Sequence, residues 1–354
     1  MSGSPIRQAP SHGKMQVSHH KIMNELVDEH PPAEQGAAIA LMLEAVIIAV
    51  TDEAPRMLIV PWEEDHAVPA KPEQRREALP HGWLEPARDR TLERALRDRV
   101  QHQTGLQLGY VEQLYTFGDA FRHSRERLSG TRVLSVAYLA LVREQHLLTG
   151  AHWRNCYDYF PWEDWRAGRP DIIPEVIEPA LRSWLANQTY AEAVREELRE
   201  RIEISFGFDA PWDPERVLER YELLYQAGLV EEAHAAGITS VGMSLPGRPM
   251  ALDHRRILAT ALGRLRGKIK YRPVVFELLP ARFTLYQLQV VAEALTGARL
   301  HKQNFRRLVE HTGLVEHTGM YETQTGGRPA QLFSFRRQVL RERPAPGVGL
   351  PRSG

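Results

Sequence analysis

Six polar side chains towards the C-terminal end of the chain are of types that hydrogen-bond to the bases and phosphates of nucleic acids. Glutamine and asparagine can pair with adenine through two hydrogen bonds, arginine pairs in the same way with guanine, and lysine more often contacts phosphate. Five of the six fall in one short segment, and the sixth stands between a glycine and a proline: Lys302, Gln303, Asn304, Arg306, Arg307 and Arg328. These residues predict a DNA-binding surface, although the same side chains would also keep a helix soluble.

Two short helices must position this segment. Thr284 has the chemistry of an N-cap, and apolar residues then recur at helical spacing until Thr296 and Gly297 end the helix. A second apolar stripe follows and leaves the polar residues on another face until Gly313. The two stripes consist of Leu285, Leu288, Val291, Ala292 and Leu295, and of Phe305, Leu308 and Val309.

Two β-strands are predicted after the helices, at residues 314–315 and 332–335. They are joined by a polar loop that ends in the sequence Thr-Gly-Gly-Arg-Pro at residues 325–329. Helix, turn, helix and a two-stranded wing is the order of a winged helix, whose second helix can lie in the major groove. Arg328 in this wing is placed to reach phosphate or the minor groove.

The charge of the chain is strongly segregated. Between Asp253 and Arg343 there are 17 Lys and Arg against 7 Asp and Glu, a net charge of +10, and the other residues carry a net charge of −10. A neutral chain is therefore a basic module joined to an acidic one, a distribution typical of a nucleic-acid-binding protein.

Composition limits the class of protein. With 354 residues, of which 43% are hydrophobic, the chain is long enough for two domains and a connecting region. No apolar run is long enough to span a bilayer, and Cys156 is the only cysteine, so we expect a cytoplasmic protein with no membrane partner, no disulfide and no cysteine-built zinc site. Residues 1–36 lack a sustained apolar period and are predicted to be a flexible arm.

The N-terminal half predicts an α+β domain. The aliphatic residues 39–50, interrupted only by Glu44, and residues 57–60 are expected to form a buried hairpin. A helix with a face of Leu92, Ala95, Leu96 and Val100 follows Gly82, and further strands are predicted at residues 111–117 and 133–142. A single carboxylate in an apolar strand is either a satisfied structural acid or a group that points at a ligand, and both interpretations of Glu44 stay open.

This order of elements, read with residues 79–106 (LPHGWLEPARDRTLERALRDRVQHQTGL), is similar to a Nudix domain. In that family the pattern G-x5-E-x7-R-E-U-x-E-E-x-G-U binds the magnesium ion that activates hydrolysis of a diphosphate. When the pattern is aligned on Gly105, its distal arginine and three glutamates fall on Asp98, Arg99, His102 and Gln103. Three of these positions cannot supply the anionic oxygens that magnesium needs, so we expect no metal site and no enzymatic activity.

Further segments make the resemblance more specific. Residues 110–123 (YVEQLYTFGDAFRH), 133–142 (VLSVAYLALV) and 254–289, with the basic NFRR and GGRPA segments, resemble the Nudix-related transcriptional regulators of NAD metabolism, the NrtR family, and within it the NadQ branch, which regulates NAD biosynthesis. The resemblance implies a homodimeric repressor of NAD biosynthesis genes that binds double-stranded operator DNA. It also implies that the degenerate Nudix domain senses an adenine nucleotide such as ATP, ADP-ribose or another NAD-related metabolite, with no cofactor required.

The expected layout has five parts. Residues 1–36 are the arm, 37–152 the Nudix-like ligand-sensing domain, 153–250 a helical connector, 251–340 the winged-helix domain and 341–354 a tail. Helical periodicity in the connector covers residues 171–186, 190–204 and 214–226. The expected ligand pocket combines stacking surfaces with a carboxylate and a cation, and its residues are Glu44, Trp62, Trp83, Phe117 and Arg132. Trp62 and Phe117 would equally serve as hydrophobic core.

Two alternatives compete with a repressor. The first is a Nudix-type hydrolase of ADP-ribose or a related dinucleotide that carries an accessory winged helix. The second keeps the winged helix but uses it to bind RNA or another protein. Release of AMP from ADP-ribose would distinguish the hydrolase from the repressor. A gel shift with the upstream DNA against RNA competitors would distinguish the repressor from a winged helix that binds RNA or protein.

Overall fold

The structure is a computed structural model that describes residues 38–62, 76–120, 122, 123, 126, 130–148, 150–238, 245–323, 328–342 and 347. The predicted N-terminal arm, the tip of the predicted wing and most of the predicted tail lie outside the described residues. Among the helices that the structure describes, none is both long and apolar enough to cross a membrane.

One mixed β-sheet organises the first half of the described chain. Its strands lie in the order β3 (Glu77–Ala78), β2 (Ala54–Pro61), β1 (Ile39–Thr51), β6 (Arg132–Leu141) and β5 (Tyr110–Phe117), while β4 (His81–Trp83) pairs with β1 and β7 (His152–Asn155) pairs with β2. The β1 and β6 strands are parallel, and the other pairs are antiparallel. The middle of β1 is buried on both faces, which explains its continuous aliphatic sequence. The predicted α+β class is confirmed.

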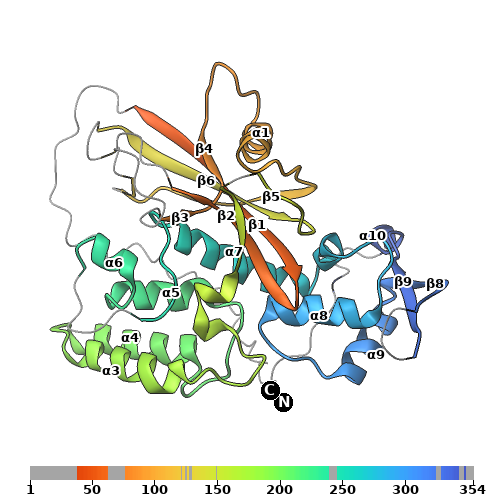
Figure 1. Cartoon of the computed structure of the whole chain (residues 1–354). Coiled ribbons are helices and arrows are strands. Elements are labelled where there is room, and N and C mark those ends of the chain that lie inside the picture. Colours follow the sequence, from red (N-terminus) through yellow and green to blue (C-terminus); the bar gives the residue numbers. More distant parts are fainter. Residues whose placement is uncertain are drawn as a thin grey trace, which may run out of the picture. The chain divides into compact units, whose positions relative to one another are not determined.

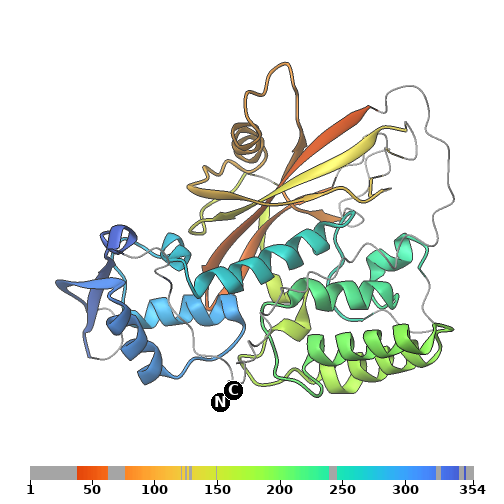
Figure 2. The same ribbon diagram turned by 180° about the vertical axis from the view of Figure 1, so that it is seen from behind.

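Alternate residues of β1 enter two different cores. Leu43 and Ala45 pack with α1 (Leu92–Thr104), whereas Val46 and Ile48 belong to the core that contains α7 (His254–Ile269) and α8 (Leu285–Thr296). Figure 1 and Figure 2 show α1 on one face of the sheet and α7 and α8 on the other. Because successive side chains of a strand point to opposite faces, Glu44 belongs to the face that α7 and α8 cover.

A largely helical region follows β7. It contains the short 3-10 helices η3 (Cys156–Asp158) and η4 (Pro161–Glu163), the π-helical turn η5 (Ile173–Ile177), and the helices α3 (Glu178–Ala186), α4 (Glu192–Phe206), α5 (Val217–Gln226) and α6 (Glu231–Ala235). The three predicted stretches of helical periodicity are confirmed, whereas the short α6 was not predicted. Apolar residues of this region and of the sheet form one continuous core, and α5 packs along α7.

The C-terminal elements have the predicted winged-helix order. After α7 and the 3-10 helix η6 (Val274–Leu278) come α8, α9 (Lys302–Thr312), β8 (Val315–Glu322), β9 (Ala330–Phe335) and α10 (Val339–Glu342). Thr284 and Gln287 form a reciprocal capping box at the start of α8, and Gly297 ends that helix in the left-handed conformation. The first wing strand is longer than the predicted residues 314–315, since β8 pairs with β9 as far as Glu322.

Candidate ligand site and nucleic-acid interface

The carboxylate of Glu44 is fully buried beneath the N-terminus of α7. Ser135 Oγ donates a hydrogen bond to Glu44 Oε1 across 2.9 Å, and His254 Nε2 lies 3.5 Å from the same oxygen. The other carboxylate oxygen, Oε2, and His254 Nε2 have no hydrogen-bond partner among the described residues. Because an unsatisfied buried polar atom is unfavourable, this pair marks a position where a bound polar group would be stabilising.

His254 is the first residue of α7 and is also fully buried. The backbone N–H of Leu79 donates to His254 Nδ1 across 2.9 Å. A ring nitrogen that accepts a hydrogen bond carries no proton, so the ring proton lies on Nε2 and faces Glu44. The helix therefore places an N–H donor next to a carboxylate acceptor.

Aromatic and imidazole rings gather around this pair and form what we call the ring cluster: Trp62, His81, Trp83, His123 and His254. The Trp62 ring lies 4.7 Å from that of His81 and stands perpendicular to that of His254 at 5.7 Å. The His123 ring contacts both tryptophans, at 5.8 Å from Trp62 and 5.3 Å from Trp83. Rings of this kind are able to stack on a planar ligand.

His81 connects the ring cluster to Glu44. It lies directly opposite Glu44 in the pairing of β4 with β1, so both side chains lie on the same face of the sheet. Burial, with a smaller effect from the neighbouring His254, lowers the pKa of His81 to about 4. The His81 ring is therefore neutral near pH 7; Nδ1 donates to the Leu79 carbonyl oxygen across 2.7 Å, which leaves Nε2 unprotonated.

Three of the five residues expected in a ligand pocket lie in this region: Glu44, Trp62 and Trp83. The three histidines were missed. His81 stands next to Gly82 of the Nudix-like segment and was within reach of sequence reasoning. His123 and His254 come from distant segments, and no local pattern connects them to β1.

Phe117 and Arg132 have other described contacts. Phe117 is buried in the core, and the Arg122 guanidinium lies 5.3 Å from its ring centre while pairing with Asp253 just before α7. Arg132 donates to the Gly118 carbonyl oxygen and lies 3.7 Å from the Glu126 carboxylate. A role of either residue in ligand binding stays a prediction.

The Nudix-like segment uses its substituted positions to hold β4. Gln103 Nε2 donates to the His81 carbonyl oxygen across 2.8 Å, and Gln103 Oε1 accepts from the His81 N–H across 3.1 Å. Arg99 Nη2 lies 3.2 Å from the Trp83 carbonyl oxygen, 2.9 Å from Glu85 Oε1 and 3.1 Å from Asp89 Oδ2. A glutamate could neither donate to these carbonyl oxygens nor pair with these carboxylates, so the substitutions suit a structural role for α1.

These residues do not fit a magnesium ion. The ion needs a near-octahedral set of oxygen ligands, whereas the Arg99 guanidinium occupies the carboxylates of Glu85 and Asp89. In the part of the chain that the structure describes, no group of three or more His, Cys, Asp or Glu side chains is arranged to hold a metal.

Five of the six predicted DNA-binding residues lie on the exposed surface of α9. Phe305 and Val309 are buried, and Leu308 is half-buried, as the apolar stripe predicts. The polar residues of the helix are all exposed: Lys302, Gln303, Asn304, Arg306 and Arg307. No described carboxylate forms an ion pair with Lys302, Arg306 or Arg307, so their charges are available to an anionic partner. Arg328 is also exposed, two residues before β9.

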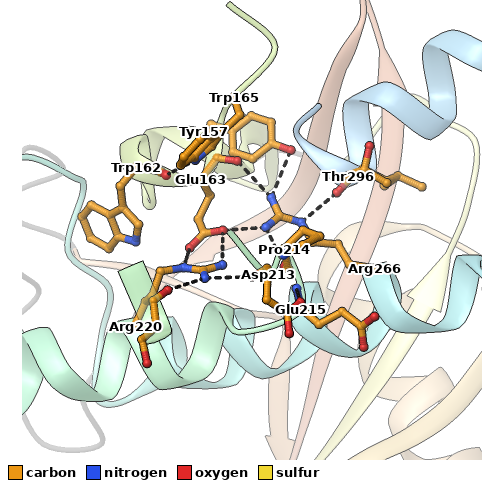
Figure 3. A network of polar contacts seen from close by, with 12 residues as sticks. Tyr157, Trp162, Glu163, Trp165, Asp213, Pro214, Glu215, Arg220, Arg266 and Thr296 are labelled. Carbon is orange, nitrogen blue, oxygen red and sulfur yellow. Dashed lines mark hydrogen bonds and ion pairs between the residues drawn. The ribbon is translucent and has the colours of Figure 1, made fainter. Parts of the chain in front are cut away.

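A buried ionic network joins η4 and α5 to α7 and to the end of α8 (Figure 3). Glu163 receives two hydrogen bonds from Arg220, at 2.6 and 2.9 Å, and one from Arg266 of α7 at 2.5 Å. Arg266 Nε also donates to the carbonyl oxygen of Leu295, in the last turn of α8, across 3.1 Å. The Tyr157 hydroxyl donates to the carbonyl oxygen of Ala294, the residue before Leu295, across 2.7 Å. Thus α7 begins at the ring cluster and, through Arg266, contacts the end of α8.

Comparison with known proteins agrees with this architecture. Residues 275–335 match the family model of the NrtR DNA-binding winged helix domain. A curated protein of Acinetobacter baylyi, described as an ADPR responsive transcriptional repressor NtrR, is 39% identical over 86 residues, which are 24% of this chain and 34% of that protein. The chain thus matches about a third of the length of this relative.

Solved structures extend the likeness to both halves of the chain. The crystal structure of Shewanella oneidensis NrtR complexed with a 27mer DNA has a TM-score of 0.51 and 21% sequence identity, and the match covers 85% of this chain and 95% of that one. A second Shewanella oneidensis NrtR structure gives a TM-score of 0.50, also with 21% identity. The expected resemblance to NrtR is confirmed at the level of the fold, and residues 275–335 match the NrtR DNA-binding winged helix domain.

Proposed function

We propose that the protein is a DNA-binding transcriptional repressor of NAD biosynthesis genes whose Nudix-like domain binds an adenine nucleotide or NAD-related metabolite without hydrolysing it. In this proposal residues 37–152 sense the ligand, residues 153–250 connect, and residues 251–340 bind double-stranded operator DNA. The proposal depends on one observation: α7 contributes His254 to the ring cluster at one end and Arg266 to the contact with α8 at the other.

The outer surface of α9 supports DNA as the partner. Its exposed side chains include two arginines and a lysine without a described carboxylate partner, together with two amides that can read base edges. The net charge of +10 between Asp253 and Arg343 adds long-range attraction to a phosphate backbone. The family match of residues 275–335 to a DNA-binding winged helix points the same way.

The ring cluster supports a nucleotide as the effector. Planar bases stack on aromatic rings, and the unsatisfied atoms of Glu44 and His254 suit a ligand with polar edges. The description of the Acinetobacter relative as ADPR responsive suggests ADP-ribose as the first candidate. Phe117 and Arg132 remain proposed neighbours of the bound ligand.

The geometry of the Nudix-like segment supports binding without catalysis. Arg99 and Gln103 engage β4 and nearby carboxylates, so neither is placed as an anionic magnesium ligand. The test is to incubate the purified protein with ADP-ribose and magnesium and to measure AMP release. We expect no release above the uncatalysed background. Turnover at an ordinary enzymatic rate would instead support a hydrolase with an accessory winged helix.

We also propose that the repressor is a homodimer that reads an inverted repeat. One winged helix buries limited surface on DNA, and two half-sites with matching symmetry supply additional affinity and specificity. Sedimentation should give a dimer at micromolar concentration and one dimer per operator. A monomer bound alone to its operator would contradict this part of the proposal.

A further inference from the structure

Glu44 and His254 present two complementary polar atoms beside each other. When the Glu44 carboxylate is ionised, its Oε2 accepts hydrogen bonds and cannot donate one. His254 Nε2 carries the ring proton, because Nδ1 accepts a hydrogen bond from the N–H of Leu79. Both side chains are fully buried, and neither of these two atoms has a hydrogen-bond partner among the described residues. An incoming group that offers a donor next to an acceptor would satisfy both atoms at once.

The surroundings of the pair favour a planar heterocycle over a phosphate. Trp62 and His81 place ring faces next to the pair, and the Glu44 carboxylate would repel a phosphate oxygen. The guanidinium of Arg122 pairs with Asp253, and that of Arg132 with Gly118 and Glu126, so these cations already have anionic or carbonyl partners. The buried pair of Glu44 and His254 therefore suits the base of a nucleotide rather than its phosphates.

We propose that Glu44 and His254 recognise the amino edge of adenine. Adenine presents an exocyclic amine donor next to a ring nitrogen acceptor, which complements a carboxylate acceptor next to an imidazole N–H donor. Hypoxanthine presents a carbonyl oxygen where adenine has its amine, and this oxygen would face the carboxylate of Glu44. The inference rests on the proposed function as a nucleotide sensor. It adds that the protein recognises the adenine base and that Glu44 and His254 are the residues that bind it.

The test compares adenine and hypoxanthine ligands by isothermal titration calorimetry on the full chain. The probes are ADP-ribose, ATP, their hypoxanthine counterparts and nicotinamide mononucleotide. We expect the wild-type protein to bind the adenine form of its ligand at least about ten-fold more tightly than the hypoxanthine form, within the range of a good two-bond base contact. Glu44→Gln should reduce this ratio about ten-fold or invert it, because an amide can donate to the hypoxanthine oxygen.

Two further variants control for structural effects. Glu200→Gln removes an exposed carboxylate on α4 and should leave the adenine-to-hypoxanthine ratio unchanged. Glu44→Asp keeps a carboxylate and should retain a preference for adenine with weaker binding, which keeps the proposal testable should Glu44→Gln fail to fold.

The outcomes separate this inference from the proposed function. If wild-type protein binds adenine and hypoxanthine nucleotides equally well, or if Glu44→Gln folds and leaves the ratio unchanged, nucleotide sensing stands and recognition of the amino edge is wrong. Binding of nicotinamide mononucleotide that is lost in Glu44→Gln would also overturn it, since a carboxamide would then be the group read. If the wild-type protein binds none of the probes at millimolar concentration, both the sensor function and the inference fail.

Discussion

Arg99 shows how one side chain changes the role of a whole segment. Its guanidinium holds the carbonyl oxygen of Trp83 and two carboxylates, and its stem packs 3.0 Å from the position that a Cβ on Gly82 would occupy. Glycine at position 82 therefore leaves room for the arginine that fixes β4. Because β4 carries His81 and Trp83, the segment stabilises the ring cluster.

Arg99→Ala tests this role. The variant removes the hydrogen bonds to Trp83 and Asp89, and we expect a loss of about 1 to 2 kcal/mol in the free energy of unfolding. Urea denaturation measures the change. Arg94→Ala is the matched control, because Arg94 is exposed on the same helix and its contact with Asp98 is 3.5 Å. Equal effects of the two substitutions would show that Arg99 does not hold β4.

His81 should make stability depend on pH. Its pKa in the folded protein is about 4, below the ordinary value of 6.5, so the unfolded chain binds more protons between these values. The stabilisation from neutral His81 is complete above about pH 6.5 and is lost as the pH falls towards 4, by about 3 kcal/mol. Urea denaturation between pH 4 and pH 7.5 should show this loss in the wild type relative to His81→Phe. Parallel stability profiles of the two proteins would contradict it.

At the scale of elements, the end of α8 is packed unusually closely. Gly297 has a φ of 71°, and a Cβ there would lie 2.3 Å from the Glu163 carbonyl oxygen and 2.9 Å from Arg266 Nη2. Gly313 at the end of α9 has a similar φ of 61°, but its Cβ would meet only the flexible end of Arg336 at 3.3 Å. Both positions need a residue that adopts a left-handed backbone conformation, but only position 297 also has no room for a side chain.

We therefore expect unequal costs from the same substitution. Gly313→Ala should lower the free energy of unfolding by about 1 kcal/mol, the cost of a left-handed conformation for a residue with a Cβ. Gly297→Ala should lower it by about 3 kcal/mol or more, because the buried contact with η4 must also move. Thermal or urea denaturation measures both. Equal losses would show that the end of α8 can shift away from Glu163 at little cost.

Side chains of α9 should divide into base readers and phosphate contacts. Gln303→Ala or Arg306→Ala should reduce discrimination between operator and scrambled DNA by about 1 to 3 kcal/mol, because each removes a contact with a base edge. Lys302→Ala should weaken both duplexes alike and reduce the salt dependence by about one phosphate. Fluorescence anisotropy at several salt concentrations distinguishes these outcomes. If all three variants affected both duplexes equally, α9 would not read sequence.

Across the whole molecule, local patterns in the sequence predicted the elements better than the contacts between them. The β1 strand follows from its aliphatic run, α8 from its N-cap, apolar stripe and terminal glycine, and α9 from its apolar stripe and terminal glycine. The chain distance between Glu44, His123 and His254 hid the ring cluster, since no periodicity connects these segments. The network of Glu163, Arg220 and Arg266 was hidden for a different reason: charged residues in sequence usually indicate solvent exposure, and these are buried only because they satisfy one another.

From these connections we predict that the ring cluster influences the proposed DNA-binding surface of α9. His254 and Arg266 both lie on α7. A ligand that shifts His254 would therefore also shift Arg266 and change its hydrogen bond to the end of α8. A coupling of about 1 to 3 kcal/mol is typical between two sites of this kind and corresponds to about five-fold to 150-fold in affinity.

The most direct test is the affinity of the purified protein for its own upstream DNA, measured by fluorescence anisotropy with and without ADP-ribose. We predict specific binding that ADP-ribose changes at least about five-fold in a reversible manner. We also predict that substitution of Lys302, Arg306 and Arg328 together by alanine removes the specific binding from a folded protein. A protein that failed to bind this DNA, or whose triple variant bound it as tightly as the wild type, would contradict the account.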